Sequence, residues 1–435
     1  MLCAYCGKRL KKSAELLLRN GLFYGLMAVA SALSITKIAL LALILPAREF
    51  TEYASLFALV GFTAEIISFG ATQATVKQFP RLSAMKRQAE IAIELRNVAR
   101  TLAWRHSISA LIGAGVFGWF YGLTGAFAAF SVCIFAFGMN IFALSSSLFR
   151  AFDKLAELGS ASAARALIAL ALSVICAFLY GWQTAFLAEA LAVTIFGLAI
   201  ASYFVLAIER EPQPAASSDR TPISGKHDGH LLFLAYMVLI VPTTFDRAFI
   251  TRFDALEAAK SYAFMGIWLT AASTVSAIFV QKFGPEMVRA QALDPLALPL
   301  ARTRKNAAVL GGLLLCSTLV SLCFVYALFY ETYWQKYGID WTAVIFAATA
   351  VALQVTPLYD WTLIALDGEK ELTKAALINL AAVAIGFLLC LWSGWGYPGY
   401  AASIAVGRLL QLVWADMAVG RLQRLNRFKA VELPE

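Results

Sequence analysis

Apolar residues in this chain occur in long runs that alternate with short polar segments. A membrane-spanning helix needs about 20 mostly apolar residues, and each run approaches or exceeds that length. The runs of the first half are about Gly21 to Leu45, Tyr53 to Val76, Thr101 to Tyr121, Gly125 to Ser147, Ser162 to Tyr180 and Ala185 to Ile208. Those of the second half are about Leu231 to Ile250, Ala259 to Val280, Asn306 to Tyr330, Trp341 to Leu366, Ala375 to Trp392 and Gly399 to Gly420. The pattern predicts about twelve transmembrane helices, six in each half.

The composition agrees with this pattern. Of the 435 residues 60% are hydrophobic and 14% charged, whereas soluble domains carry about 25% charged residues. Twelve spans use up most of the length, so we predict an all-α integral membrane protein with almost no mass outside the bilayer. The first run is longer than the apolar part of a signal peptide, and we expect it to be the first helix.

Positive charge is concentrated on one side of the predicted topology. The net charge is +9, but the cations lie in short segments between the runs and form no basic face, so we expect no nucleic-acid partner. One side begins with Lys8, Arg9, Lys11, Lys12 and Arg19 and continues with the cations that follow the even-numbered spans. The other side offers only Arg48, Arg252, Lys260 and Lys336. By the positive-inside rule we expect both termini to face the cytoplasm. We expect a multi-pass protein of the bacterial inner membrane.

A polar segment divides the chain into two halves. Residues 209–230 mix Pro, Ser, Gly and both charge signs, a composition typical of flexible linkers. We therefore predict an N-terminal six-helix bundle over 1–208, a cytoplasmic linker over 209–230 and a C-terminal six-helix bundle over 231–435.

The two halves look like a diverged duplication. Subtracting residue numbers gives similar offsets of 209, 204 and 214 for the pairs Tyr53 and Tyr262, Phe79 and Phe283, Asp153 and Asp367. An even number of spans in each half makes the repeats parallel, and transporters built in this way place their site between the repeats near the midplane. The sequence thus predicts a central cavity.

Cations inside the predicted spans are candidates to line that cavity, because an ionisable side chain costs about 2.5 to 3.5 kcal/mol in a span. They are Lys37 in the first span, Arg247 in the seventh, just after Pro242, and Arg408 in the twelfth. Arg binds phosphate oxygens in a bidentate manner and Lys acts as a point charge, so these side chains would hold an anionic head group. Alternatively, Arg247 and its neighbour Asp246 mark the point where the seventh span reaches the interface.

Three acidic residues are candidates for ion coupling or for ion pairs. Glu65 lies near the middle of the second span, and either pairs with Lys37 or Arg408 or takes up a proton. Asp246 lies in the outer third of the seventh span. Asp360 follows Pro357 in the tenth span; it belongs either to the same cavity or, about two turns from the cytoplasmic end, to the side chains that snorkel to the interface.

Metal or redox chemistry is not expected. Five of the seven cysteines lie inside apolar runs, which implies no disulfide framework. Cys3 and Cys6 resemble half of a zinc knuckle, but a structural zinc needs four ligands. The histidines His106, His227 and His230 are not spaced from carboxylates within a span as the ligands of a metal site would be. We therefore expect no cofactor, no metal and no catalytic residue.

Four passages resemble the Wzx-type polysaccharide flippases of the multidrug/oligosaccharidyl-lipid/polysaccharide exporter superfamily. They are LALILPAREFTEYASLFALVGFTAEIISFGATQATVKQFP, FDRAFITRFDALEAAKSYAF, ALDGEKELTKAALIN and GYAASIAVGRLLQLV. The resemblance covers most of the chain in layout, although Cys3 to Cys6 is not a family feature.

This resemblance implies two six-helix bundles that flip a polyprenyl-pyrophosphate-linked oligosaccharide from the cytoplasmic to the periplasmic leaflet for surface polysaccharides such as O-antigen or exopolysaccharide. Arg247 matches the charged position of the seventh-span passage, and Lys37 and Arg408 match a cationic lumen. Membrane lipids and the polysaccharide polymerase machinery are the expected partners.

Three alternatives stay open at this stage. A cation-coupled drug or small-molecule antiporter of the same superfamily shares the fold and differs in substrate. A major-facilitator carrier needs a GxxxDRxGRR-like loop where this chain has KQFPRLSAMKRQ. A membrane polysaccharide polymerase or ligase carries its chemistry on large outer loops, whereas the predicted outer loops here are short, so we expect no enzyme.

Overall fold

The described residues form α-helices and one short π-helix, joined by turns, and include no strand. In this computed structural model the described residues are 21–34, 36–38, 40–41, 43–210, 228–253, 256–294, 299–335 and 338–431. The chain divides into two compact units, Met1–Gly225 and Lys226–Glu435. The predicted linker is described only at its ends, because α6 runs to Arg210 and α7 begins at Asp228; residues 211–227 lie outside the described part.

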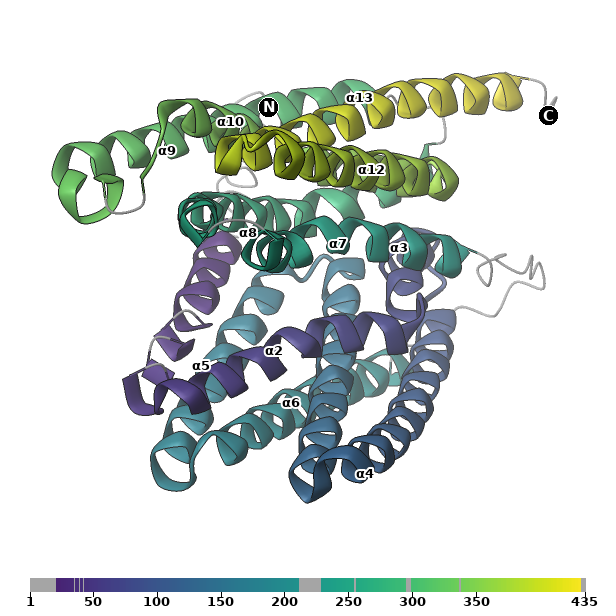
Figure 1. Cartoon of the computed structure of the whole chain (residues 1–435). Coiled ribbons are helices and arrows are strands. Elements are labelled where there is room, and N and C mark those ends of the chain that lie inside the picture. The colour runs from purple at the N-terminus through teal and green to yellow at the C-terminus, as the bar shows by residue number, and fades with distance from the viewer. Residues whose placement is uncertain are drawn as a thin grey trace, which may run out of the picture. The chain divides into compact units, whose positions relative to one another are not determined.

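The first described element of the first unit is the apolar helical segment Gly21–Ile38, called the first helix below. Its labelled helices are α2 (Ala47–Ser68), α3 (Ala71–Ala84), α4 (Gln88–Ala151), α5 (Leu155–Tyr180) and α6 (Trp182–Arg210), shown in Figure 1. The second predicted span is broken between α2 and α3, where Phe69 and Gly70 adopt φ of 45° and 81°. The third and fourth spans are two helices that meet at Gly122, whose backbone is not helical (φ of 69°), and they share the label α4.

The second unit contains α7 (Asp228–Phe253), α8 (Leu256–Leu293), α9 (Pro299–Leu328), the π-helix η1 (Tyr330–Gln335), α10 (Trp341–Ala352), α11 (Thr356–Ala365), α12 (Glu369–Ser393) and α13 (Gly396–Val431). The tenth predicted span is therefore two helices, α10 and α11, joined by a tight turn. Each of the twelve predicted runs falls on a helix or a helix pair, which confirms the all-helical class. Eight described segments are long and apolar enough to span a membrane by themselves.

Each unit has a core in which a tyrosine of α2 or α8 packs edge-on against an aromatic residue of the unit's last helix. In the first unit Tyr53 contacts Phe186 of α6, with ring centroids 5.7 Å apart and an interplanar angle of 81°. In the second, Tyr262 contacts Tyr400 of α13 at 6.3 Å and the same angle of 81°. Edge-to-face pairs of this kind add to the stability gained by burial. The recurrence supports the duplication that the sequence suggested.

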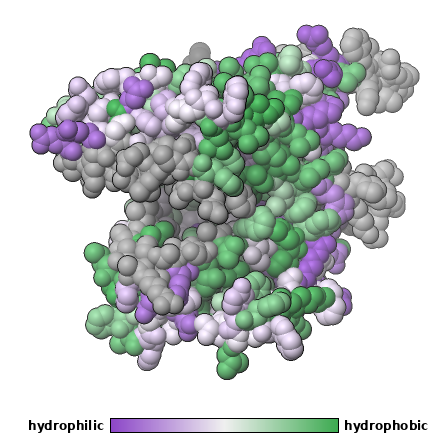
Figure 2. Space-filling model, viewed as in Figure 1, coloured by the Kyte–Doolittle hydropathy of each residue, from purple (hydrophilic) through white to green (hydrophobic). Residues whose placement is uncertain are grey.

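Large apolar side chains cover the outer face of the helices. Leu123, Trp392 and Trp119 are 91%, 87% and 86% exposed, and Figure 2 shows a broad area of hydrophobic residues on the visible face. Water-soluble monomers rarely expose contiguous apolar patches beyond a few hundred Å². A lipid environment explains this surface, because it removes the cost of exposing apolar groups.

Helices α4 and α6 approach closely because of one glycine. A Cβ built on Gly138 would lie 2.5 Å from Oγ1 and 2.8 Å from the backbone nitrogen of Thr194. Small residues at such contacts let membrane helices pack backbone to backbone.

We expect Gly138→Ala to destabilise the protein by about 1–3 kcal/mol, because the added methyl group collides with backbone that cannot yield. Gly115→Ala, also in α4 and with nothing within 4 Å of the built Cβ, is the matched control and should gain up to about 1 kcal/mol from helix propensity. Thermal unfolding of the purified variants in detergent measures both. Equal stability of the two variants would contradict the close packing of α4 on α6.

Candidate functional site

A polar cluster in the first unit is built around the carboxylate of Glu189 in α6. Lys37 of the first helix forms an ion pair with Oε1, the Tyr53 hydroxyl of α2 donates to Oε2, and Ser173 of α5 donates to Oε2 at 3.1 Å. The Lys37 ammonium also lies 4.6 Å from the centre of the Phe57 ring, a cation–π contact. One carboxylate thus connects four helices.

Burial makes this cluster energetically important. Lys37 is 4% exposed and Glu189 3%. Two charges removed from water are stable only when their geometry is good and further hydrogen bonds satisfy the carboxylate, and Tyr53 and Ser173 supply those bonds. Removing one member leaves the other charge without compensation.

A second polar cluster lies where α2 ends and α3 begins. Glu65 accepts a hydrogen bond from the side chain of Gln73. Arg105 of α4 donates to the backbone oxygen of Ser68 at 2.6 Å, and Asn140 donates to that of Ala64 at 2.9 Å. These bonds satisfy carbonyl groups near the helix end. Lys37, one of the two partners suggested for Glu65 from the sequence, instead pairs with Glu189, and Glu65 pairs with Gln73.

The second unit buries a different polar chain. Arg408 of α13 donates from Nη1 to Gln411 Oε1 at 3.3 Å and to Thr356 Oγ1 at 3.4 Å. Gln411 in turn donates to Asp360 Oδ1 of α11 at 3.4 Å. Arg408 and Asp360 are only 8% and 6% exposed. Asp360 is therefore buried inside the unit, and snorkelling toward the cytoplasm is wrong for it.

The remaining predicted pair lies in α7. Asp246 accepts a hydrogen bond of 2.7 Å from the Tyr262 hydroxyl of α8, whereas the side chain of Arg247 lies outside the described residues. Asp246 precedes Tyr262 by 16 positions, and the same spacing separates Lys37 from Tyr53 (53 minus 37). The two units thus place side chains of opposite charge at equivalent positions of the repeat.

Two ionisable residues escaped the sequence analysis. Glu189 and Arg165 both lie within predicted spans, so the cost of an ionisable side chain in lipid would have singled them out. Arg165 of α5 contacts the Phe142 ring at 4.3 Å and Met139 Sδ at 3.4 Å. Its Nε is buried without a hydrogen-bond partner among the described residues. Its charge is attracted by the carboxylate of Glu189, which therefore faces a second cation besides Lys37.

Comparison with known proteins assigns the fold. No family model and no curated protein matches the chain, but solved structures do. A mutant of the Vibrio cholerae MATE transporter VcmN is 14% identical, with a TM-score of 0.76 over 94% of this chain and 97% of that one. The chain has the MATE-transporter fold.

Further MATE structures agree. An outward-facing multidrug resistance MATE family transporter of the MOP superfamily is 12% identical, with a TM-score of 0.68 over 94% of this chain and 96% of that one. The eukaryotic MATE transporter AtDTX14 is 13% identical, with a TM-score of 0.66 over 97% and 99%. The superfamily printed for the outward-facing transporter is the one to which the Wzx-type flippases of the sequence resemblance belong, and the neighbours named here are themselves MATE transporters. The substrate roles of Lys37, Arg247 and Arg408 stay predictions.

We expect Lys37→Met to lower the stability of this MATE-fold protein by about 3–5 kcal/mol, because Glu189 then carries a buried uncompensated charge. Adding Glu189→Gln should restore part of the loss, since the neutral amide keeps partners for Tyr53 and Ser173. The control Lys154→Met breaks the exposed pair with Glu157, whose charged atoms are 3.6 Å apart, and should change stability by less than about 0.5 kcal/mol. Thermal unfolding of Lys37→Met, Glu189→Gln, the double variant and the wild type gives the coupling energy. A purely additive double variant would argue against the pair.

Proposed function

We propose that the chain is a secondary-active exporter that works by alternating access, as a cation-coupled antiporter of small amphipathic molecules. The supporting observation is the likeness to MATE transporters over 94% of the chain, including one named for multidrug resistance. These neighbours are transporters and not enzymes, in line with the absence of an acid–base pair on long outer loops in the sequence.

The Glu189 cluster supplies a coupling group for this cycle. Protonation of Glu189 would leave Lys37 without its counter-ion and weaken the link between the first helix and α6. A buried group that loses its main partner on taking up a proton can bias a bundle between two arrangements. Among the acidic residues singled out from the sequence, Glu65, Asp246 and Asp360 each have a polar partner within their own unit and are the further candidates.

The flipping of lipid-linked oligosaccharide is the second candidate. The four passages that resemble Wzx-type flippases favour it, and so does Arg165, a buried guanidinium whose Nε has no hydrogen-bond partner among the described residues. A pyrophosphate would compensate such a guanidinium by bidentate hydrogen bonds. This function would place the protein in the inner membrane of a bacterium, beside polysaccharide polymerase machinery.

The test of the antiporter is transport by purified protein in liposomes with an imposed proton or sodium gradient and a fluorescent amphipathic cation. Glu189→Gln made together with Lys37→Met, so that no buried charge of the pair is left alone, should reduce gradient-driven transport by about tenfold or more, because a group that carries the coupling ion is needed in every cycle. Glu157→Gln, an exposed substitution of the same kind, should transport normally. Gradient-dependent transport that survives Glu189→Gln would remove Glu189 from the mechanism.

The flippase is tested by deleting the gene in its host, followed by lipid extraction and leaflet-specific labelling of polyprenyl-pyrophosphate oligosaccharide. Its accumulation on the cytoplasmic side, with loss of surface polysaccharide, would favour flipping. Complementation with Arg165→Gln should then restore export poorly, whereas Arg165→Lys, which keeps the charge, should restore part of it. Normal glycan with altered tolerance of drugs or cations would favour the antiporter.

A further inference from the structure

One end of the second unit carries cations on its surface that no ion pair neutralises. They are Lys305 of α9 and Arg421 and Arg424 of α13; all three are exposed, and within the part of the chain that the structure describes none of them forms an ion pair. The neighbouring Arg304 differs, because its guanidinium donates hydrogen bonds of 2.8 and 2.6 Å to the carboxylate of Asp416. Three positive charges on two helices are therefore available to an anion.

Contacts between α9 and α13 bring these cations to one place. The backbone nitrogen of Leu300, near the start of α9, donates to Gln423 Oε1 of α13 at 3.4 Å. One turn further along α9, the ion pair of Arg304 reaches an earlier turn of α13. The two helices therefore run antiparallel here, with the first turns of α9 beside the C-terminal part of α13. Lys305 follows Arg304 directly and Arg424 follows Gln423, so both lie next to residues that join the helices.

On both helices the cations continue an exposed apolar face. The exposed apolar residues of α13 recur at intervals of four, three and four positions: Val406, Leu410, Val413 and Met417. Arg421 and Arg424 come four and seven positions after Met417, which places them on the same face of the helix. On α9 the exposed Val309 and Leu313 are preceded by Lys305, again at intervals of four. Each face thus changes from apolar to cationic, as expected where a helix leaves the hydrocarbon and reaches the head groups.

This combination of charge and apolar surface suits an anionic phospholipid. Arg binds phosphate oxygens through parallel N–H donors, and Lys adds a point charge. A Lys or Arg near a membrane surface strengthens the binding of anionic lipid by about fivefold. The apolar part of each face has room for acyl chains, which a dissolved phosphate ion does not have. A lipid therefore uses both parts of the surface, whereas a dissolved ion uses only the cations.

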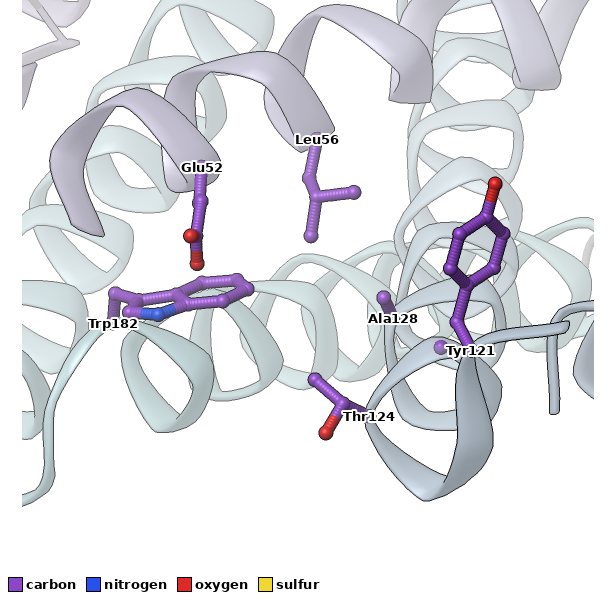
Figure 3. A pocket seen from close by; sticks show the side chains of 7 residues that line it. Glu52, Leu56, Tyr121, Thr124, Ala128 and Trp182 are labelled. Atoms are coloured by element: carbon purple, nitrogen blue, oxygen red, sulfur yellow. The ribbon is translucent and has the colours of Figure 1, made fainter. Parts of the chain in front are cut away.

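The pocket of the first unit has the opposite chemistry. It has a volume of about 430 Å³ and lies between residues of α2, α4 and the start of α6, as Figure 3 shows. Among the described residues that line it, Glu52 alone is charged. A carboxylate repels a phosphate group, so the exposed surface of the second unit suits an anionic head group and this pocket does not.

We propose that Lys305 of α9 together with Arg421 and Arg424 of α13 binds the head group of an anionic phospholipid. The acyl chains of this lipid lie along the apolar residues of the same two helix faces. The site, called the α9–α13 surface below, uses none of the residues proposed for transport. It is therefore independent of the choice between the two candidate functions.

The experiment uses the purified full chain in detergent and native mass spectrometry, which counts the phospholipid molecules that stay bound. Phosphatidylglycerol is compared with phosphatidylcholine of the same acyl chains, because both have a phosphate and only the first has a net negative charge. We expect the wild type to bind its first phosphatidylglycerol at least about threefold more tightly than phosphatidylcholine. Equal binding of the two lipids would overturn the proposal.

Substitutions of the three cations locate the site. Lys305→Gln, Arg421→Gln and Arg424→Gln should each weaken phosphatidylglycerol binding by about two- to fivefold, and the triple variant by about tenfold or more, with phosphatidylcholine binding unchanged. Arg424→Lys keeps the charge and should retain most of the affinity. Thermal unfolding of each variant confirms that the fold is intact, which is expected because the substituted side chains are exposed.

Lys374→Gln is the matched control. Lys374 is also exposed and lies near the start of α12, but its ammonium pairs with Glu371 at 2.7 Å. Its substitution should leave phosphatidylglycerol binding as in the wild type. A triple variant that binds phosphatidylglycerol as tightly as the wild type would overturn the proposal, and so would an equal loss of affinity in Lys374→Gln, because the effect would then come from overall charge.

Glycerol 1-phosphate, which has the anionic phosphate without acyl chains, distinguishes a lipid from a dissolved anion. Its binding to the full chain is measured in the same detergent over the same concentrations. We expect no binding at concentrations that saturate the first phosphatidylglycerol site. Binding as tight as that of the lipid, lost in the triple variant, would assign the α9–α13 surface to dissolved phosphate compounds and overturn its assignment to a phospholipid.

Discussion

A carboxylate buried in an apolar helical bundle has to be compensated, and in the first unit this requirement is met at Glu189. Its two oxygens receive a lysine, a tyrosine and a serine from three other helices. The arrangement fixes the rotation of each helix about its own axis, because a turned helix would present an apolar side chain to the charge. Aromatic packing of Tyr53 on Phe186 then completes the core around it.

The second unit meets the same requirement with different residues. Tyr262 keeps the position and the edge-on packing of Tyr53, but its hydroxyl donates to Asp246, which stands where the first unit has Lys37. Arg408 and Asp360 are connected through hydrogen bonds to Gln411. A duplicated architecture thus carries two different polar cores. An exporter that couples one ion to one substrate benefits from such an asymmetry, since each unit can respond to a different event.

The two candidate functions require different charged side chains in these polar cores. A cation-coupled antiporter needs a buried carboxylate, and the first unit provides one in Glu189 with its partner Lys37. A flippase for a pyrophosphate-linked lipid needs a buried cation with a free hydrogen-bond donor, and Arg165 has such a donor at Nε among the described residues. The two candidate functions therefore depend on different side chains of the same helical bundle.

The sequence by itself determined the all-helical membrane class and the position of the spans. An apolar run either is or is not long enough to cross the bilayer, and this can be judged from the run alone. It also indicated which residues are costly to bury, including Lys37, Arg408 and Asp360. Only the tertiary structure decided their partners: Glu189 for Lys37, Gln73 for Glu65, Gln411 for both Arg408 and Asp360. Partners lie on other helices, up to 152 positions away for Lys37 and Glu189. Which helix faces meet depends on how the helices rotate and pack against one another. The close approach at Gly138 and the breaks at Gly70 and Gly122 are part of that packing. The periodicity of a single run does not show which other helix it will contact.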